Sequence, residues 1–432
     1  MEESEYQEKA YEYAFKRVPD DKRKSLLSLT VVLSGYPIAL SNFVVGGTVG
    51  FGLSFLDAII VLLVGNAVLI SIVIATGLLA YKTGLSTAFL SKRAFGKSGS
   101  HIFSFLLTIS AVTWVSLNGD IFSRLINSTF SWWPLPISIT AVLVIYMWML
   151  SAINGYKGLE FISMLGVPAA IVLSFVGVIS VGRSADGFSG VFQYVPSEPI
   201  TFTTATASIV GGWVFGATIT PDVCRFAKSK SHVVIAGLVA FLIGCFSFQF
   251  AGALIAISTG QGDFTLAMTA LGLGLVAFFT AVFCLWTTQD NNIYGASLAL
   301  QNVIKDTKYY GKIKHKHIAF TIATLGAVFA AGGIFNIIMP IIQFLSLLIP
   351  PVPGVIMAEE WFIKKPKHSF VVNHRAIIAW LIGGILGFIS LRTGFFVPPI
   401  IGMFSAGIAY LLMEKFRQSS ELIDSEKEEV IG

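Results

Sequence analysis

The sequence predicts an all-α membrane protein with about twelve transmembrane helices. The chain has 432 residues, of which 55% are hydrophobic and only 12% are charged, and its mean hydropathy is +0.78. A soluble domain typically carries about a quarter charged residues. Several apolar stretches reach the roughly 17 to 25 residues that a helix needs to cross a bilayer. Basic clusters and sparsely charged connections alternate between these stretches, as expected for a chain that crosses a membrane repeatedly.

The apolar stretches define the expected spans. Leu56–Leu79 contains one charged residue, Asp57, at its outer edge, and Ile137–Ile153 and Val167–Val181 contain none. We expect one transmembrane domain over residues 25–413, between a polar tail at 1–24 and an acidic tail at 414–432. The twelve expected spans are Leu26–Val49, Phe55–Ala80, Gly99–Ile126, Ile137–Ile153, Leu159–Val181, Phe202–Val223, Val233–Ser258, Thr265–Leu300, Ile318–Ala331, Phe335–Phe362, Ala376–Leu391 and Pro398–Met413.

The distribution of charge predicts the orientation. Lysine and arginine cluster at residues 22–24, 92–97, 225–230, 305–316 and 364–375, and every second connection is nearly uncharged. Cytoplasmic loops are the basic ones, so we expect a multi-pass protein of the plasma membrane with both termini in the cytoplasm. The first 24 residues lack the apolar centre and cleavage site of a signal peptide and are expected to form a cytosolic tail. The acidic tail is expected to be disordered.

Glycine and proline interrupt the first and sixth expected spans. The first contains Ser34-Gly35-Tyr36-Pro37 and later Gly46-Gly47, and the sixth contains Gly211-Gly212-Trp213 and later Thr220-Pro221. A broken helix frees backbone carbonyls for an ion or a solute. Broken spans in matching positions of two five-helix halves, about 25–183 and 200–364, indicate the binding site of an inverted-repeat transporter, with two extra helices at 376–413. The alternative is that these glycines only permit close helix packing.

A polar run interrupts the eighth expected span. Residues 286–292 read Trp-Thr-Thr-Gln-Asp-Asn-Asn between apolar flanks. Such side chains are costly in lipid and therefore face a cavity or a partner. The hydroxyls of Thr287 and Thr288 suit a hard monovalent cation such as sodium, and the Gln289 amide both donates and accepts, as the edge of a heterocycle requires. Asp290 either belongs to this site or anchors a neighbouring helix.

Two tryptophans are candidates for stacking on a planar solute. Trp114 lies in the third expected span and Trp213 in the sixth. Stacking of one base on an aromatic side chain contributes roughly 1 to 3 kcal/mol. Asn118 lies four residues after Trp114, on the same helical face, and is expected to hydrogen-bond the stacked ring. A single buried tryptophan is more often a packing residue, and Asp120 and Asn66 are more simply explained as bridges between helices.

Five short motifs are spread along the chain between Gly35 and about Glu360. They are Gly46-Gly47-Thr48 with the following Gly50 to Ser54, Lys82-Thr83-Gly84-Leu85, Thr220-Pro221-Asp222-Val223-Cys224-Arg225-Phe226, Thr287-Thr288-Gln289-Asp290-Asn291 and Ile349-Pro350-Pro351-Val352-Pro353-Gly354-Val355-Ile356. Together these motifs resemble the nucleobase:cation symporter-1 family, most closely its cytosine permease branch.

The resemblance implies a leucine-transporter-like fold with a five-plus-five inverted repeat and two C-terminal helices. It implies sodium as the coupling ion and no other cofactor, with the sodium ligands listed as Gly35, Ile38, Cys284, Thr287 and Thr288. It implies a solute site formed by Trp114, Asn118, Gly212, Trp213, Phe215 and Gln289. Ala111 and Phe215 stand where cytosine carriers have a glutamine and a serine, whereas Asn118 and Trp213 resemble the hydantoin and allantoin carriers.

The leading hypothesis is therefore import of a nucleobase or related azaheterocycle by sodium-coupled symport with alternating access. Proton coupling, or a different small solute such as a vitamin precursor or an amino acid, remains an alternative on the same fold. A membrane enzyme is disfavoured because the spans contain no paired histidine or acidic motif, and a channel or sensor would not need a closed stacking pocket. Cys224, Cys245 and Cys284 lack metal-ligand spacing. The expected partners are the small solute and the lipid bilayer, with no nucleic acid and no obligate protein partner.

Overall fold

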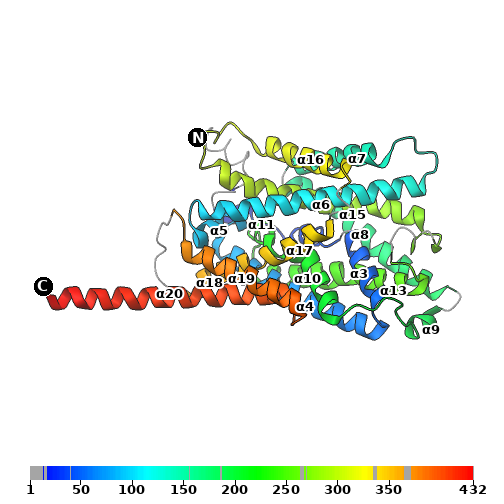
Figure 1. The fold of residues 1–432 in the computed structure, drawn as a ribbon. Coiled ribbons are helices and arrows are strands. Elements are labelled where there is room, and N and C mark those ends of the chain that lie inside the picture. Colours follow the sequence, from blue (N-terminus) through cyan, green and yellow to red (C-terminus); the bar gives the residue numbers. More distant parts are fainter. Residues whose placement is uncertain are drawn as a thin grey trace.

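The computed structural model describes residues 13, 17–38, 40–154, 156–184, 187–262, 267–268, 270–333, 338–363 and 371–431. Regular structure in these residues is helical, apart from one isolated parallel bridge between Lys24 and Ala227, so the all-α prediction is confirmed. The elements, drawn in Figure 1, are η1 (Asp20–Lys22), α2 (Leu26–Ser34), α3 (Leu40–Gly52), α4 (Phe55–Thr83), α5 (Thr87–Phe95), α6 (Gly99–Thr129), α7 (Ile137–Ala152), α8 (Tyr156–Gly182), α9 (Gly187–Phe192), α10 (Phe202–Ile219), α11 (Pro221–Cys224), α12 (Lys230–Leu238), the π-helix η2 (Val239–Phe246), α13 (Ser247–Thr259), α15 (Gly274–Ile304), α16 (His315–Ala331), α17 (Ile338–Leu348), α18 (Pro351–Phe362), α19 (His374–Thr393) and α20 (Pro398–Ile431).

The membrane character follows from these helices. Within the described residues, six single helical stretches have the length and hydropathy to cross a bilayer, and α7 with the first part of α8 forms a seventh candidate bent by 117°. The twelve expected spans are consistent with this, because broken spans are not counted as single long helices. The first span is divided between α2 and α3, and the tenth between α17 and α18. The expected starts of the eighth and tenth spans, Thr265 and Phe335, lie outside the described residues.

The first span is broken as predicted, but at one place rather than two. Helix α2 begins after Ser25, whose hydroxyl caps it by accepting from the Ser28 amide at 3.3 Å, and ends at Ser34. The chain then turns and resumes as α3 at Leu40. Gly46 and Gly47 lie inside α3, so the expected second break is wrong. A Cβ atom on Gly46 would lie 1.9 Å from the Gln249 carbonyl oxygen, so this glycine lets α3 and α13 approach closely.

The sixth span is interrupted at the second of the two predicted places and not at the first. Helix α10 runs without a break from Phe202 to Ile219, so the expected interruption at Gly211-Gly212-Trp213 is wrong. The irregularity lies at Thr220, after which α11 starts with Pro221. Two adjacent glycines weaken a helix in water, but in a membrane the backbone has no water to replace its hydrogen bonds. Gly211 faces Ser346, whose Cβ atom lies 3.1 Å from an added Cβ, so close packing accounts for this glycine.

Parts of both terminal segments are ordered against or beyond the helical bundle. In the part of the polar tail that is described, Val18 is fully buried and its amide donates to the Gly84 carbonyl at 3.2 Å. Most of residues 1–16 lie outside the described residues. Helix α20 continues to Ile431 and projects beyond the other helices (Figure 1), so the expected disorder of the acidic tail is wrong. Residues 414–431 contain neither glycine nor proline and are rich in glutamate and lysine, which favour helix.

The core brings the broken first span against the polar eighth span. Helix α3 packs on α13, α10 packs on α4, and α15 packs on both α6 and α8. Helices α19 and α20 pack on each other and on α18, as expected for two additional C-terminal helices. The run Thr287–Asn292 of α15 is buried throughout, with side chains between 0% and 4% exposed. This arrangement hides the polar residues of α15 from lipid and places Thr288 at the break between α2 and α3.

Candidate substrate and ion site

Backbone oxygens of the break between α2 and α3 surround one threonine of α15. The Thr288 hydroxyl oxygen lies 3.2 Å from the Gly35 carbonyl oxygen, 3.1 Å from that of Ile38 and 3.0 Å from that of Cys284. The Tyr36 carbonyl oxygen is 3.4 Å away. The Gly35 and Ile38 carbonyls are available because the chain leaves α2 at Ser34. Four of the five predicted ion ligands therefore meet at one buried point.

The fifth predicted ion ligand, Thr287, is held from the other side. Its hydroxyl lies 2.6 Å from the Ser163 hydroxyl on α8, and both side chains are fully buried. A Cβ atom on Gly35 would lie 2.3 Å from the Thr287 hydroxyl and 2.6 Å from that of Ser163. The Thr287 hydroxyl is thus adjacent to the break. Ser163 was not predicted, because a single serine in an apolar helix gives no sequence signal of its own.

The chemistry of these oxygens fits a small hard cation. All the oxygens are neutral carbonyls or hydroxyls, the type of ligand that such cations prefer. Oxygens that share a cation at about 2.3–2.6 Å lie about 3 to 4 Å from one another. The separations of 3.0–3.4 Å around Thr288 fall in this range. Among the described residues, no group of three histidine, cysteine or acidic side chains forms a transition-metal site.

Two indole rings face each other beside this cluster. The ring centroids of Trp114 on α6 and Trp213 on α10 are 6.3 Å apart, and the ring planes differ by 15°. Offset aromatic pairs have ring centroids about 4.5–7 Å apart, so the two indoles form a nearly parallel aromatic pair. Their flat faces lie beside the carbonyl cluster, where a planar ring could stack on them.

A small cavity adjoins the indoles and has room for about one water molecule, with a volume of about 10 Å³. Its lining residues are Tyr36, Trp114, Asn118, Gly212, Trp213, Phe215, Gly216, Thr288 and Asn292. Five of the six predicted solute contacts lie here. Tyr36, Gly216 and Asn292 were not predicted, and Thr288 was predicted only as an ion ligand. Asn292 lies four residues after Thr288 in the polar run and therefore on the same helical face, and this spacing is the sequence signal that predicts its place in the site.

Two amides at the site have unused hydrogen-bonding capacity. Neither side-chain polar atom of Asn118 has a hydrogen-bond partner among the described residues, although Asn118 is only 1% exposed. Gln289, the sixth predicted solute contact, does not line the cavity. Its amide oxygen accepts from Asn292 at 3.4 Å, and its amide nitrogen has no partner in the described part of the chain. A buried amide without a partner is costly, so Asn118 is poised to receive a ligand.

Asp290 belongs to a different contact. Its carboxylate accepts a hydrogen bond of 2.6 Å from the Ser151 hydroxyl at the end of α7, and the Trp286 indole nitrogen donates to the same hydroxyl at 2.6 Å. Asp290 thus anchors α7, the second of the two roles considered for it. Asn66 bridges α4 and α13 by donating to Gln249 at 2.7 Å, whereas Asp120 pairs with Arg124 of its own helix at 2.6 Å.

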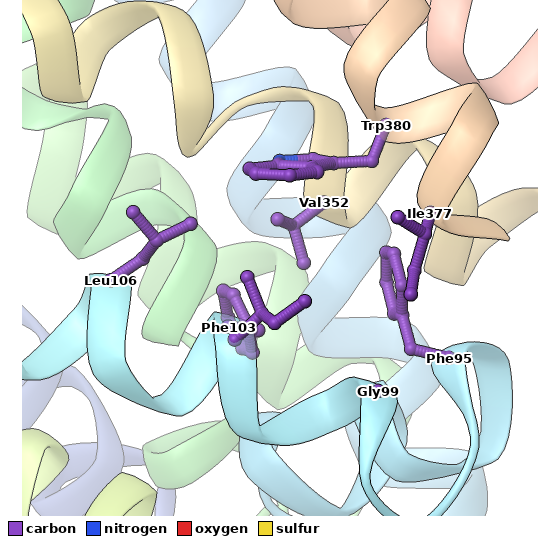
Figure 2. A pocket seen from close by; sticks show the side chains of 8 residues that line it. Phe95, Gly99, Phe103, Leu106, Val352, Ile377 and Trp380 are labelled. Carbon is purple, nitrogen blue, oxygen red and sulfur yellow. The ribbon is translucent and has the colours of Figure 1, made fainter. Parts of the chain in front are cut away.

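Other cavities lack groups that recognise a polar ring. The cavity in Figure 2 lies between α5, α6, α18 and α19 and is lined by apolar side chains, and its Trp380 nitrogen already donates to the Leu348 carbonyl at 2.8 Å. Two larger cavities of about 360 and 500 Å³ have no amide or charged side chain in their lining. The indole pair with Asn118 is therefore the best candidate solute site in the described residues.

Comparison with solved structures supports this fold. A structure of Mhp1, a nucleobase-cation-symport-1 family transporter, in a closed conformation with bromovinylhydantoin bound, has a TM-score of 0.80 at 14% identity and covers 94% of this chain and 95% of its own. An inward-facing structure of Mhp1 has a TM-score of 0.77 at 15% identity, over 94% of this chain and 93% of its own. A sodium-coupled sialic acid symporter has a TM-score of 0.67 at 12% identity, over 95% and 93%. These likenesses confirm the predicted fold.

Sequence comparison identifies the family. Cytosine permease of Escherichia coli strain K12 is 28% identical over 400 residues, which are 92% of this chain and 92% of the relative, and cytosine permease of Escherichia coli O157:H7 has the same identity and coverage. A family model described as permease for cytosine/purines, uracil, thiamine, allantoin matches residues 17–412. Because this match covers nearly the whole chain, the protein belongs to that family of permeases and is an integral membrane transporter.

Proposed function

We propose that this chain imports a nucleobase or related azaheterocycle across the plasma membrane by sodium-coupled symport with alternating access. The observation that carries the proposal is the pair of nearly parallel indoles, Trp114 and Trp213, 6.3 Å apart beside the unpartnered amide of Asn118. Aromatic faces recognise a planar ring, and an amide recognises an edge with a donor next to an acceptor.

The lining favours rings with a lactam or amidine edge. Asn118 offers one acceptor and one donor pair, which match an adjacent N–H and C=O of a ring such as uracil, hypoxanthine, allantoin or hydantoin, or the amino and ring nitrogen of cytosine. Phe215 and Gly212 contribute no polar side-chain atom. The names of the family and of the relatives, which include cytosine, purines, uracil, allantoin and a hydantoin, support this range of solutes.

Sodium is the coupling ion that the oxygen cluster favours. Gly35, Ile38, Cys284, Thr287 and Thr288 would hold it with neutral oxygens, and the ion would supply a positive charge that ties the break in the first span to α15. The expected fifth span, Leu159–Val181, contains no lysine or arginine that would replace the ion with a fixed charge. Proton coupling is the alternative, and accumulation that follows a pH gradient without sodium would identify it.

One residue, Thr288, belongs to both the solute cavity and the carbonyl cluster and thereby couples solute binding to ion binding. Thr288 lines the cavity beside the indoles and also lies at the centre of the carbonyl cluster. An ion that orders Thr288 and the break therefore changes the wall of the solute cavity. Because such coupling is reciprocal for binding, the solute must tighten ion binding by the same factor that the ion tightens solute binding.

The test is uptake of radiolabelled cytosine, hypoxanthine, uracil, allantoin and hydantoin into proteoliposomes, with and without an inward sodium gradient. Native protein is compared with Thr288→Ala and with the control Thr206→Ala, whose buried hydroxyl donates only to the Phe202 carbonyl of its own helix at 2.8 Å. We expect sodium-driven accumulation of one compound class in native protein and in the control, and none in Thr288→Ala. Accumulation that ignores sodium would reject the ion, and uptake of none of the compounds would reject the solute class.

A further inference from the structure

A chain of buried amides leads to the indole nitrogen of Trp213, and none of its members lines the cavity. The Trp213 indole nitrogen donates to the side-chain oxygen of Asn42 on α3. The same oxygen accepts from the Gln249 amide of α13 at 2.8 Å, and Gln249 in turn accepts from Asn66 of α4 at 2.7 Å. Three polar side chains from three helices thus form a hydrogen-bonded chain that ends at the nitrogen of Trp213.

These amides are fully enclosed. Asn42 and Gln249 are 0% exposed and Asn66 is 1% exposed. Burying an amide in a membrane protein is costly unless its groups are hydrogen-bonded. Neither polar atom of the Asn42 side chain is left unpaired, since its oxygen accepts from Trp213, Gln249 and Cys245 and its nitrogen donates to the Pro37 carbonyl. Hydrogen bonds on both polar atoms fix the orientation of the Asn42 side chain.

The other end of this chain is the break in the first span. Pro37, which accepts from Asn42, lies between Tyr36 and Ile38, and the carbonyl oxygens of these two neighbours are 3.4 and 3.1 Å from the Thr288 hydroxyl. A rearrangement of the break therefore moves the acceptor of Asn42. Through Asn42, the carbonyl cluster and the Trp213 indole are joined by two consecutive hydrogen bonds.

The helix that carries Gln249 is a rigid support for this connection. A Cβ atom on Gly46 would lie 1.9 Å from the Gln249 carbonyl oxygen, and one on Gly252 would lie 2.3 Å from the Phe43 carbonyl oxygen. Helices α3 and α13 therefore meet backbone to backbone in the turn that follows Asn42, at Phe43 and Gly46. Because this packing is close, Asn42 can move only together with α3.

We propose that Asn42 is a positioning residue that holds the Trp213 indole in its stacking orientation and transmits the state of the broken first span to it. The inference rests on the proposed function, in which Trp213 stacks on the solute and the break holds sodium. Asn42 does not line the solute cavity and contributes no oxygen to the carbonyl cluster. Its action on both sites is through Trp213 and Pro37.

The test uses full-length protein labelled with 5-fluorotryptophan and studied by fluorine NMR in detergent. The Trp213 resonance is assigned by its absence in Trp213→Phe. We expect sodium to shift this resonance in native protein and in the control Ser71→Ala, whose exposed hydroxyl donates within its own helix at 2.8 Å. We expect Asn42→Ala to move the resonance and to abolish its sodium response, while Asn42→Ser, which keeps an acceptor, restores part of that response.

Binding provides the second readout. The factor by which saturating sodium tightens solute binding, about 5 to 150 for typical coupling, should fall to near one in Asn42→Ala. Trp213→Phe keeps a stacking ring but removes the donor, and combining it with Asn42→Ala should cost no more than the worse single change, because both break the same bond. If Asn42→Ala does not fold, Trp213→Phe alone must lower the coupling factor.

The outcomes separate the two proposals. A native resonance that responds to sodium together with an equal response in Asn42→Ala would overturn the role of Asn42 and leave the proposed function intact. Additive losses in the double variant would also overturn it. Absence of any sodium response and of any solute binding in native protein would instead reject the proposed function, on which the coupling role depends.

Discussion

The Thr288 hydroxyl oxygen and the Gly35 carbonyl oxygen lie 3.2 Å apart, although 253 residues separate them in the chain. The contact exists because α2 ends at Ser34 and leaves the following carbonyls without helical partners. One hydroxyl thus connects the first and eighth spans at a buried point. The predictions below test what this connection and the neighbouring indole pair do.

Replacing the Thr288 hydroxyl should separate ion coupling from folding. Thr288→Val keeps the shape of the side chain and removes its oxygen, whereas Thr288→Ser keeps the oxygen and removes a methyl group. We expect Thr288→Ser to retain sodium-driven uptake and Thr288→Val to lose at least about tenfold in apparent sodium affinity, which corresponds to about 1.4 kcal/mol. The measurement is initial uptake rate against sodium concentration. Equal sodium dependence in both variants would show that the hydroxyl is not an ion ligand.

Glycine at position 35 should be irreplaceable, whereas glycine at position 47 should not. An alanine methyl at Gly35 would lie 2.3 Å from the Thr287 hydroxyl and 2.6 Å from that of Ser163. At Gly47 the nearest atom would be 3.6 Å away, an ordinary contact. We therefore expect Gly35→Ala to abolish sodium-dependent solute binding and Gly47→Ala to retain it, measured by isothermal titration calorimetry. Native-like sodium dependence in Gly35→Ala would contradict the ion site at the break.

The indole pair should contribute stacking energy to solute binding. Trp114→Ala removes one of the two stacking faces, and we expect it to weaken binding by roughly 1 to 3 kcal/mol, or about 5- to 150-fold in Kd. Trp114→Phe should lose less, because it retains a ring. The matched control is Trp380→Phe, since Trp380 lines the separate apolar cavity of Figure 2. A loss in the control as large as that in Trp114→Ala would indicate a general effect on the fold.

Asn118 should affect function and stability in opposite directions. Its two polar atoms are buried without a partner among the described residues, so Asn118→Leu removes an unsatisfied amide and should leave the melting temperature unchanged or raise it. The same variant should lose solute binding by tenfold or more, since nothing replaces the amide. Asn302→Leu is the structural control, because the Asn302 amide donates to Ser100 and Ser104 at 3.0 and 3.2 Å and its loss should lower the melting temperature.

Some residues of this site have a signal in the sequence and others do not. The run Thr287–Asn292 predicts a polar interior face, and the break at Gly35 predicts free carbonyls. That the two meet is implied by the resemblance to the symporter family and not by these patterns. The contacts of Ser163 and Asn42 cannot be predicted in this way. Helical periodicity shows which face of a helix is buried, but it does not show which residue of another helix lies opposite. Asn42 is a single amide in an apolar helix, and its partners are 171 and 207 residues away.

The glycines show the limit of propensity arguments in a membrane. Gly46, Gly211 and Gly212 lie in unbroken helices, although glycine is a poor helix former in water. Without water as a competing partner, the backbone keeps its internal hydrogen bonds, and the glycines serve close packing instead. In the first and sixth spans, the helix ends and restarts where a proline follows closely, at Pro37 and Pro221.

The carboxylate of Asp306, in the loop after α15, should make the stability of the protein depend on pH. Burial alone would raise the pKa of Asp306, but hydrogen bonds from Lys92, Lys97 and His101 and the charge of Lys92 hold that pKa below its ordinary value. The Lys92 ammonium lies 3.0 Å from the carboxylate. A carboxylate whose pKa is lowered by folding stabilises the protein above its unfolded pKa of about 3.9, and this stabilisation is lost as the pH falls through the lower folded value.

Asp306→Asn should therefore destabilise the protein at pH 7 by about 1 to 3 kcal/mol. The difference from native protein should shrink as the pH falls below about 4, where the carboxylate of the unfolded chain becomes protonated while the native carboxylate is still charged. The measurement is the melting temperature in detergent at pH 7, 5, 4 and 3. Asp21→Asn is the control, because Asp21 pairs with Lys22 at 3.3 Å on the surface, with both side chains more than half exposed, and such pairs contribute little. A difference for Asp306→Asn that stayed constant down to pH 3 would mean that the Asp306 charge does not stabilise this loop, and that the variant acts through packing alone.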